Sequence, residues 1–570
     1  MPDGDDKSII LPELLAPCGS PEALDAALLA GADAVYLGGR VLNARMNAKN
    51  FGNDILPDAV KKAHAAGVKV YVTMNTLVTD RAMREAMEQA SFLYGIGVDA
   101  LIVADLGFAS MLRRYLPGMP IHASTQVSGH DLEAARFLAE AGFSRMVCAR
   151  ELTRENIEYL VRNSPIPIEM FIHGAMCVSA SGQCLMSSFI GGRSGNCGEC
   201  AQPCRMQYNG SYPLSLKDMC LAGHITEIIS SGVASLKIEG RMKSPEYVYT
   251  VVSVYRRLLD EQRSANANEM KLLEAAFSRG GFTDGYYTGD LRGMNGVRSE
   301  SDKRNTDKLR VDFRPVKRET HPINLTDERE TPALPESFNE KGEKIKFKPV
   351  RSARWYRPET MCGGDFFEIN YIPLDSFEKY SANGVLMPPV IPDSERKEVR
   401  KKLIAAREKG ALHALVGNIG HIELAKECGF IIHGDYRLNL FSNASARIFD
   451  GFEDLLLSPE LILPQLRDIN AKKGIIVYGR IPLMTLERSC GARTLVDRTK
   501  AGFPVIKEGG REIVFNSVPT YMADQRDKLK AAGPFSEHFI FTVESRTEAE
   551  QIINGYKKCQ PPGRPVKRIR

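Results

Sequence analysis

The chain has 570 residues, which is more than one ordinary domain holds and predicts two or three domains. Hydrophobic residues make up 43% and charged residues 25%, a composition that excludes a largely disordered chain and is typical of a globular protein. The formal net charge of +5 is only mildly basic. Charge alone therefore permits an RNA partner without arguing for one.

The ends of the chain and its cysteines indicate where the protein works. Residues 1–9 are acidic and polar, which argues against a signal peptide and predicts a disordered segment. No apolar run approaches the roughly 18 residues of a membrane helix. We therefore expect a cytoplasmic protein without membrane contact, in a reducing compartment where structural disulfides are rare. Five of the 12 cysteines fall between Cys177 and Cys204, and such crowding in a reducing cell indicates metal or redox chemistry.

In chain order, residues 10–292 alternate short apolar strands with amphipathic helices. Ser20, Pro21 and Glu22 form a helix start, and Gly31 is placed to end that helix. The strand candidates are Leu14–Pro17, Ala34–Gly38, Val68–Met74, Ala100–Ala104, Ile121–Ser124, Arg145–Ala149, Glu169–His173 and Ser235–Glu239. Eight such strands predict a TIM-type (β/α)8 barrel, an α/β fold, with Pro245–Gln262 as its last helix. An open doubly wound sheet is the rival, but no Gly-rich dinucleotide turn follows the first strand.

The second half of the chain predicts a linker and a further domain. Residues 293–350 are rich in charged residues, Pro and Asn, and predict a polar linker or small insertion. Residues 351–558 resume the alternation, with strand candidates Phe366–Ile372, Ala414–Gly417, Phe430–His433, Leu455–Leu457 and Ile475–Tyr478. These predict a second, incomplete α/β barrel-like domain. We expect the basic–aromatic segment Arg354–Arg357 to lie on its surface, where it could stack a base, and residues 559–570 to form a basic tail.

Four cysteines form the most specific pattern. Cys177, Cys184, Cys200 and Cys204 have the spacing Cys-x6-Cys-x15-Cys-x3-Cys, in a Gly-rich segment just past the seventh strand. Barrel enzymes place their active sites at that end. Four thiolates suit a 4Fe-4S cluster. Zinc usually takes two tight pairs and is the first alternative, and buried cysteines without metal are the second. Cys197 is a fifth thiol inside the segment.

Around these cysteines the sequence resembles a known family. The runs Glu169–Cys177 and Ser181–Ser187 resemble the signature of the collagenase-like peptidase family U32. Further matching segments are Glu13–Pro17, Asn43–Phe51, Cys200–Arg205, Leu236–Arg241, Tyr478–Met484 and Asp497–Arg498. The resemblance covers most of the chain, and its central motif is highly specific.

The resemblance implies a function and a cofactor. Similar members hydroxylate RNA without oxygen: some modify the tRNA wobble uridine with prephenate, and others a cytidine of large-subunit rRNA. Some members act on ubiquinone precursors instead. The hydroxylases carry a 4Fe-4S cluster whose ligands correspond to Cys177, Cys184, Cys200 and Cys204. We therefore expect that cluster, prephenate as a co-substrate, tRNA or rRNA as a partner, and a redox partner. One departure is Cys197, which stands where the family pattern leads us to expect Arg.

Polar and charged residues at or after the predicted strands supply the other site candidates. His173 and Glu239 are the candidate acid and base. The candidate substrate-binding residues are Asn43, Arg45, Lys49, Lys237 and Arg241. The basic ones suit carboxylates or phosphates. The alternatives are a satisfied core histidine at His173 and structural ion pairs elsewhere, for example Glu239 with Arg241.

The family name leaves proteolysis open as a second function. The sequence has neither a His-Glu-x-x-His zinc helix nor a Gly-x-Ser-x-Gly elbow. A peptidase reaction would need Cys197 as nucleophile or a metal-bound water, because Cys177 bound to iron is not free to attack a carbonyl. A non-catalytic scaffold is the third possibility.

Overall fold

The computed structural model describes residues 11–46, 48–316, 349–561 and 565–569, together with residues 318, 320–323, 329, 331–335, 337, 338 and 563. The expected disordered segment 1–9 lies outside this set, as does much of the expected linker between residues 324 and 348. Throughout the described ranges, no helix combines the length and apolar character needed to cross a membrane.

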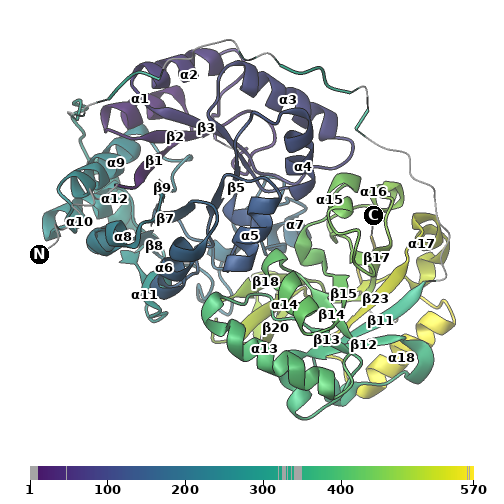
Figure 1. The fold of residues 1–570 in the computed structure, drawn as a ribbon. Coiled ribbons are helices and arrows are strands. Elements are labelled where there is room, and N and C mark those ends of the chain that lie inside the picture. The colour runs from purple at the N-terminus through teal and green to yellow at the C-terminus, as the bar shows by residue number, and fades with distance from the viewer. Residues whose placement is uncertain are drawn as a thin grey trace, which may run out of the picture.

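The first half of the chain folds into a closed parallel barrel (Figure 1). Its eight strands are β1 (Glu13–Cys18), β2 (Ala34–Gly38), β3 (Lys69–Met74), β4 (Ala100–Val103), β5 (Ile121–Ala123), β6 (Arg145–Val147), β7 (Ile168–Gly174) and β9 (Ser235–Ile238). Each strand pairs in parallel with the next, and β9 closes the ring between β7 and β1. The predicted TIM-type barrel is confirmed and the open sheet is excluded, because an open sheet would leave two edges unpaired.

Helices cover the outside of this barrel. They are α1 (Pro21–Leu29), α2 (Leu56–Ala65), α3 (Met83–Gly95), α4 (Leu106–Tyr115), α5 (Leu132–Glu140), α6 (Arg154–Asn163), α8 (Ile225–Ser231) and α9 (Pro245–Asp260). The predicted start of α1 is confirmed: the Ser20 side chain accepts a hydrogen bond from the backbone N–H of Ala23. Gly31 follows the helix with φ of +84°, a conformation that favours glycine.

The second half forms another closed parallel barrel. Its strands are β11 (Val350–Trp355), β12 (Ile369–Pro373), β13 (Gly384–Leu386), β14 (His413–Val416), β15 (Ile431–Gly434), β16 (Leu455–Leu456), β17 (Lys473–Gly479) and β23 (Ser536–Phe541). β17 pairs with both β16 and β23, and β23 pairs with β11, which completes the ring. The expectation of an incomplete second barrel is therefore wrong. Its helices include α13 (Asp393–Glu408), α14 (Ile422–Glu427), α15 (Asn443–Arg447), α16 (Leu463–Asp468), α17 (Arg526–Ala532) and α18 (Arg546–Lys557).

The segment Arg354–Arg357 is not the surface patch that its composition predicted. Trp355 is fully buried and stacks on Phe541 at 4.2 Å between ring centroids. Arg354 is also fully buried, and its guanidinium pairs with Asp435 at 2.7 Å. A buried arginine needs a charged partner. The burial of Arg354 could therefore be predicted only by pairing it with Asp435, which lies 81 residues further along the chain.

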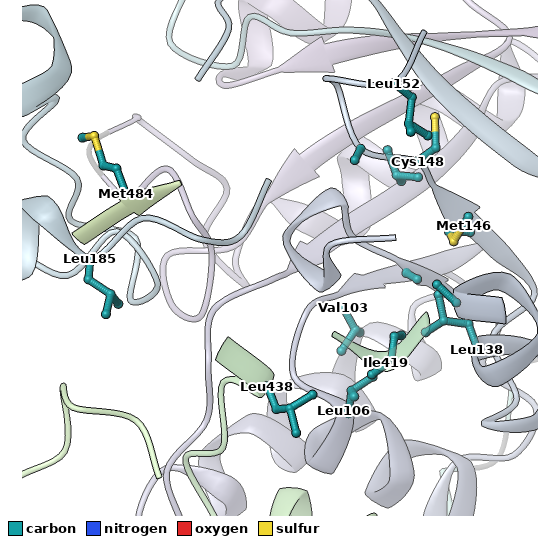
Figure 2. Packing of buried hydrophobic residues seen from close by; sticks show 14 of the residues in the cluster. Val103, Leu106, Leu138, Met146, Cys148, Leu152, Leu185, Ile419, Leu438 and Met484 are labelled. Carbon is teal, nitrogen blue, oxygen red and sulfur yellow. The ribbon is translucent and has the colours of Figure 1, made fainter. Parts of the chain in front are cut away.

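An antiparallel sheet inserted between β17 and β23 joins the two barrels. It consists of β18 (Pro482–Leu486), β19 (Thr494–Val496), β20 (Gly502–Glu508) and β21 (Arg511–Phe515). β18 lies against residues 175–205 of the first barrel, a segment called here the cysteine loop: Ala180 N–H donates to Thr485 O and Leu185 N–H donates to Leu483 O. Apolar packing continues this interface. Figure 2 shows Ile419 and Leu438 of the second barrel beside Leu106 of the first, within one hydrophobic cluster.

The described parts of the linker and the tail both pack on the barrels. α12 (Glu300–Lys308) follows the first barrel, and Val316 N–H then donates to Leu29 O at the end of α1. In the tail, the backbone N–H of Lys567 donates to Pro519 O, and Arg568 pairs with Asp524 at 2.6 Å. These contacts hold residues 565–569 against the second barrel.

Candidate functional site at the mouth of the first barrel

A cavity of about 150 Å³ opens at the carboxyl ends of the strands of the first barrel. Tyr36, Thr73, Ile102 and Phe171 line it from the strands themselves, and the cysteine loop forms the opposite wall. Active sites of (β/α)8 enzymes lie at this end because the loops that follow the strands converge there. The cavity is therefore the candidate site that the fold itself indicates.

Tight backbone packing fixes the cysteine loop. β7 runs directly into the loop, and Gly182 adopts φ of +74° against the loop after β5. A Cβ at Gly182 would stand 2.1 Å from the carbonyl oxygen of Gln126, so only glycine fits. The buried Glu151 carboxylate accepts from both the N–H and the hydroxyl of Ser181. These contacts hold the loop between Cys177 and Cys184.

The four predicted cysteines, Cys177, Cys184, Cys200 and Cys204, all line the cavity, and Cys197 does not. Arg150 NH1 donates to Cys177 Sγ at 3.6 Å, and the backbone N–H of Gln202 donates to Cys200 Sγ at 3.4 Å. Burial raises the pKa of Cys204 to about 12. It raises the pKa of Cys184 well above the ordinary thiol value, and the charges of the other three cysteines add to that effect. Such thiols lose their protons readily only to a bound cation.

The arrangement of the thiols bears on which metal group they suit. Across the described residues, no three or more His, Cys, Asp or Glu side chains stand close enough together to hold a single metal ion. A tetrahedral zinc site needs all four sulfurs about 2.3 Å from one point. The four cysteines border one shared cavity.

Glu239 and Arg45 form the main charged pair in the cavity. Arg45 NH2 stands 3.1 Å from Glu239 Oε1, so Glu239 pairs with Arg45 and not with Arg241. Burial alone would raise the pKa of Glu239, but the charges of Arg45, Arg150 and Arg241 outweigh it and lower that pKa to about 2. Glu239 is therefore ionised at neutral pH.

Lys237 and Arg241 also reach the cavity, and both already have partners. Lys237 Nζ donates to the fully buried Glu169 at 2.8 Å, the structural ion pair considered as an alternative. Arg241 donates to Thr73 Oγ1 at 2.7 Å, and the Nε of Arg241 is buried without a partner. Burial lowers the pKa of Arg241 to about 10, which still leaves it cationic at neutral pH.

Three predicted site residues lie outside the cavity lining. The His173 ring is buried against Tyr255 and Phe282, and its Nδ1 stands 3.3 Å from the hydroxyl oxygen Oη of Tyr255. Burial lowers the pKa of His173 to about 3, so it is neutral near pH 7. Asn43 is buried and accepts from the Arg45 N–H, which supports the cavity wall from behind. Lys49 is largely exposed and faces Glu22 at 3.8 Å.

Other cavity residues were missed in the sequence. Arg150 directly follows the sixth predicted strand, so its position at a strand end was a usable signal. No pattern in the sequence marked Asn196, apart from its place among the cysteines of the loop. Met484 comes from β18 of the second half and lies near Leu185, as Figure 2 shows. No local pattern could place Met484, because its position depends on how the two barrels pack.

The fold and the site together define a double (β/α)8-barrel protein with a four-cysteine cavity at the mouth of the first barrel. Comparison with known proteins identifies its family. Residues 19–295 match the model of peptidase family U32. The chain is also 35% identical over 315 residues to the "Collagenase" of Porphyromonas gingivalis (strain ATCC BAA-308 / W83), covering 49% of this chain and 74% of that protein. The chain belongs to peptidase family U32.

Two further relatives are named for RNA modification. The chain is 41% identical over 259 residues to the "23S rRNA 5-hydroxycytidine C2501 synthase" of Escherichia coli (strain K12), over 44% of this chain and 39% of that protein. It is 39% identical over 266 residues to the "tRNA hydroxylation protein P1" of Bacillus subtilis (strain 168), over 44% of this chain and 63% of that protein. Less than two thirds of each of these two relatives is therefore covered.

Proposed function

We propose that this protein is an iron–sulfur enzyme that hydroxylates a nucleobase of tRNA or rRNA without molecular oxygen. The observation that carries the proposal is the convergence of Cys177, Cys184, Cys200 and Cys204 on one cavity at the mouth of the barrel. The similarity to two relatives named for RNA hydroxylation supports the substrate class.

The four cysteines would hold a 4Fe-4S cluster, which takes four thiolate ligands. When bound, the cluster supplies electrons that it receives from a redox partner. The N–H donors of Arg150 and Gln202 point at two of the sulfurs, and hydrogen bonds to sulfur raise the reduction potential of such clusters. Structural zinc is the weaker alternative, because it usually takes two tight pairs of cysteines, and here only Cys200 and Cys204 form one.

The cations of the cavity would bind the hydroxyl donor. We propose an organic acid, with prephenate as the candidate, because Arg45, Arg150 and Arg241 present guanidinium groups that match carboxylates. Glu239 is a poor proton donor with a pKa of about 2. Its role in the proposal is to hold the Arg45 fork in place.

RNA would present its target base to this cavity. A base inside a helix cannot reach a recessed site, so the base must be single-stranded or leave its stack. A reducing, cytoplasmic location is part of the proposal, because tRNA and rRNA are found there and every cysteine of the chain is a free thiol.

Two measurements test the proposal. Protein purified without oxygen should absorb broadly near roughly 400 nm and contain about four irons with acid-labile sulfide, and Cys177→Ser should lose both. Nucleoside mass spectra of tRNA and rRNA from a deletion strain should lack one hydroxylated nucleoside. A protein that stays iron-free after anaerobic reconstitution, or unchanged nucleosides in both RNA classes, would refute the proposal.

A peptidase is the second candidate, and the cavity gives it little support. No histidine is found among the described residues that line the cavity, so no imidazole stands ready to activate a thiol. Burial raises the pKa of Cys197, whereas a nucleophilic cysteine needs a lowered pKa. Cleavage of unfolded collagen by the iron-free protein, abolished in Cys197→Ser, would favour this candidate.

A further inference from the structure

Beside the cavity, three cations gather around one aromatic ring. Lys243, from the turn after β9, lies directly over the ring of Phe277, which follows α10 (Ala267–Ala276). The guanidinium carbon of Arg298 stands 4.3 Å from the ring centroid and that of Arg279 stands 5.7 Å away. The three residues come from three different loops, so the cluster is a product of the fold and not of a charged run in the sequence.

Carboxylates lie near these cations, but few of them pair directly: Asp218 and Glu239 act on the pKa of Lys243, and Arg298 acts on the pKa of Asp302. Arg279 NH1 stands 3.4 Å from Oδ1 of the buried Asp218. In the part of the chain that the structure describes, neither Lys243 nor Arg298 has a carboxylate within 4.0 Å. The Nε of Arg298 is buried without a hydrogen-bond acceptor. Half-buried cations that repel one another are unfavourable unless an anion joins them.

Backbone contacts hold the three cations close together. Gly296 lies so close to Arg279 that a Cβ there would stand 2.2 Å from the Arg279 carbonyl oxygen. Gly296 N–H also donates to Ser215 O, which ties the loop of Arg298 to the segment before Asp218. These contacts hold the loops of Arg279 and Arg298 close together. Burial lowers the pKa of Lys243 to about 7; Asp218 opposes this shift, and Arg279 and Arg298 reinforce it.

The cluster lies near the cavity, although none of its residues lines it. Glu239, which lines the cavity, is close enough to act on the pKa of Lys243, and Cys204 acts on the pKa of Arg279. A nucleotide whose base entered the cavity would carry its sugar–phosphate backbone out through the mouth. Lys243, Arg279 and Arg298 gather positive charge near the carboxyl end of β9, a suitable place for one of its phosphates.

We propose that Lys243, Arg279 and Arg298 form a binding site for a backbone phosphate of the RNA substrate, next to the base that enters the cavity. This inference rests on the proposed RNA function. A phosphate would complete the charge of the cluster, since arginine binds phosphate in a two-point geometry and lysine as a point charge. Contacts of this kind position the RNA without reading its sequence.

RNA binding at several salt concentrations tests the site. The probes are total tRNA and total rRNA from a strain that lacks the protein, titrated against anaerobic protein in increasing KCl. Lys243→Gln with Arg279→Gln should weaken binding and lower the slope of log affinity against log salt by about 1. Arg162→Gln is the matched control: Arg162 lies in the last turn of α6, at the opposite end of the barrel, and should leave the slope unchanged.

Amine labelling tests the same site in the unaltered protein. At pH 7 the Lys243 amine should react with acetic anhydride about tenfold or more faster than exposed lysines, because a larger fraction of it is unprotonated. RNA should suppress that labelling, and inorganic phosphate at the same phosphate concentration should suppress it much less.

The possible outcomes are distinct. RNA binding with an unchanged salt slope in the double variant and no protection of Lys243 would overturn the site but leave the proposed function. Equal protection by inorganic phosphate and RNA would assign the site to a small phosphate and overturn the RNA assignment. Failure of the unaltered protein to bind either RNA class at low salt would remove the proposed function and the site with it.

Discussion

Asn196 in the cysteine loop donates a hydrogen bond of 2.7 Å from its Nδ2 to Oε2 of Glu460 in the second barrel. Asn196 also lines the cavity, and its backbone oxygen accepts from the Leu77 N–H of the first barrel. Glu460 of the second barrel thus contacts the wall of the site. The second barrel is part of the site, through Glu460 and through Met484 of β18.

Replacing Glu460 by Ala should loosen the cysteine loop. Loss of a hydrogen bond to a charged group costs about 1.5–3 kcal/mol of unfolding free energy. We expect urea unfolding at a lower midpoint and faster loss of iron from the reconstituted protein. Glu460→Gln keeps an oxygen acceptor and should stay near the unaltered protein. Glu453→Ala is the control, because Glu453 is half exposed and its nearest cation, Lys472, is 3.8 Å away. Equal iron loss in Glu460→Ala and the control would contradict the expectation.

Cys197 should prove dispensable for the cluster. It lies outside the cavity that Cys177, Cys184, Cys200 and Cys204 line. Cys197→Ser should therefore retain about four irons per chain, whereas Cys184→Ser should lose most of them, because a cubane needs four thiolates. Iron and sulfide analysis after anaerobic reconstitution distinguishes the two variants. A colourless Cys197→Ser protein would show that the ligand set is wrong.

Glu508 should make the second barrel less stable as pH rises. Burial raises the pKa of Glu508 to about 7, with Arg437 opposing the shift. The folded state then holds a proton that the unfolded state, with a pKa near 4.5, has lost. Stability from this group is present below about pH 4.5 and is lost as pH rises through 7. The 2.5-unit difference corresponds to about 3 kcal/mol.

The measurement compares urea unfolding of the unaltered protein and Glu508→Gln at pH 5 and pH 8. Glu508→Gln should be the more stable of the two at pH 8, and the gap should be much smaller at pH 5. Other titrating groups affect the stability of both proteins equally, so their effect cancels in the comparison. One such group is Asp131, whose pKa burial also raises to about 7. A gap that is independent of pH would refute the assignment.

Met484 should control access to the cavity without affecting the cluster. Met484→Trp would add bulk to the wall opposite the strands and is expected to lower RNA hydroxylation by about 10–100-fold, since small displacements of a substrate cost that much. Iron content should stay the same. Met522→Leu is the control, because Met522 is fully buried in the same half of the chain and is not among the residues that line the cavity. Loss of iron in Met484→Trp would mean that the substitution disturbs the loop and not only the entrance.

The first barrel could be predicted almost strand by strand. Its strands are continuous apolar runs such as Ala34–Gly38, because parallel strands are buried on both faces. Five of the eight strands of the second barrel could be predicted from the sequence. β11 and β23 contain Arg354 and His538, buried polar residues whose partners lie far along the chain, and β13 has only three residues. Local hydrophobicity cannot reveal strands of these kinds.

The residues of the site likewise divide into those that could be predicted from the sequence and those that could not. The four cysteines and the charged residues at strand ends were visible, since strand ends meet at the mouth of a barrel. His173 was predicted by the same rule, but its ring points into the aromatic cluster of Tyr255 and Phe282. The direction of a side chain at a strand end depends on the local twist, for example the register shift between β7 and β9 at this point, which the sequence does not reveal.

The pairing of Leu185 N–H with Leu483 O sets an order of events during synthesis. The ribosome makes the chain from its N-terminus, and β18 emerges about 300 residues after Cys184, which takes roughly 15–60 s. Until then the cysteine loop lacks the strand that supports it, although the first barrel has all its own strands. The time for which the thiols lack this support, and in which they would be open to oxidation or to the iron of the proposed cluster, is therefore set by the time needed to translate the residues up to β18.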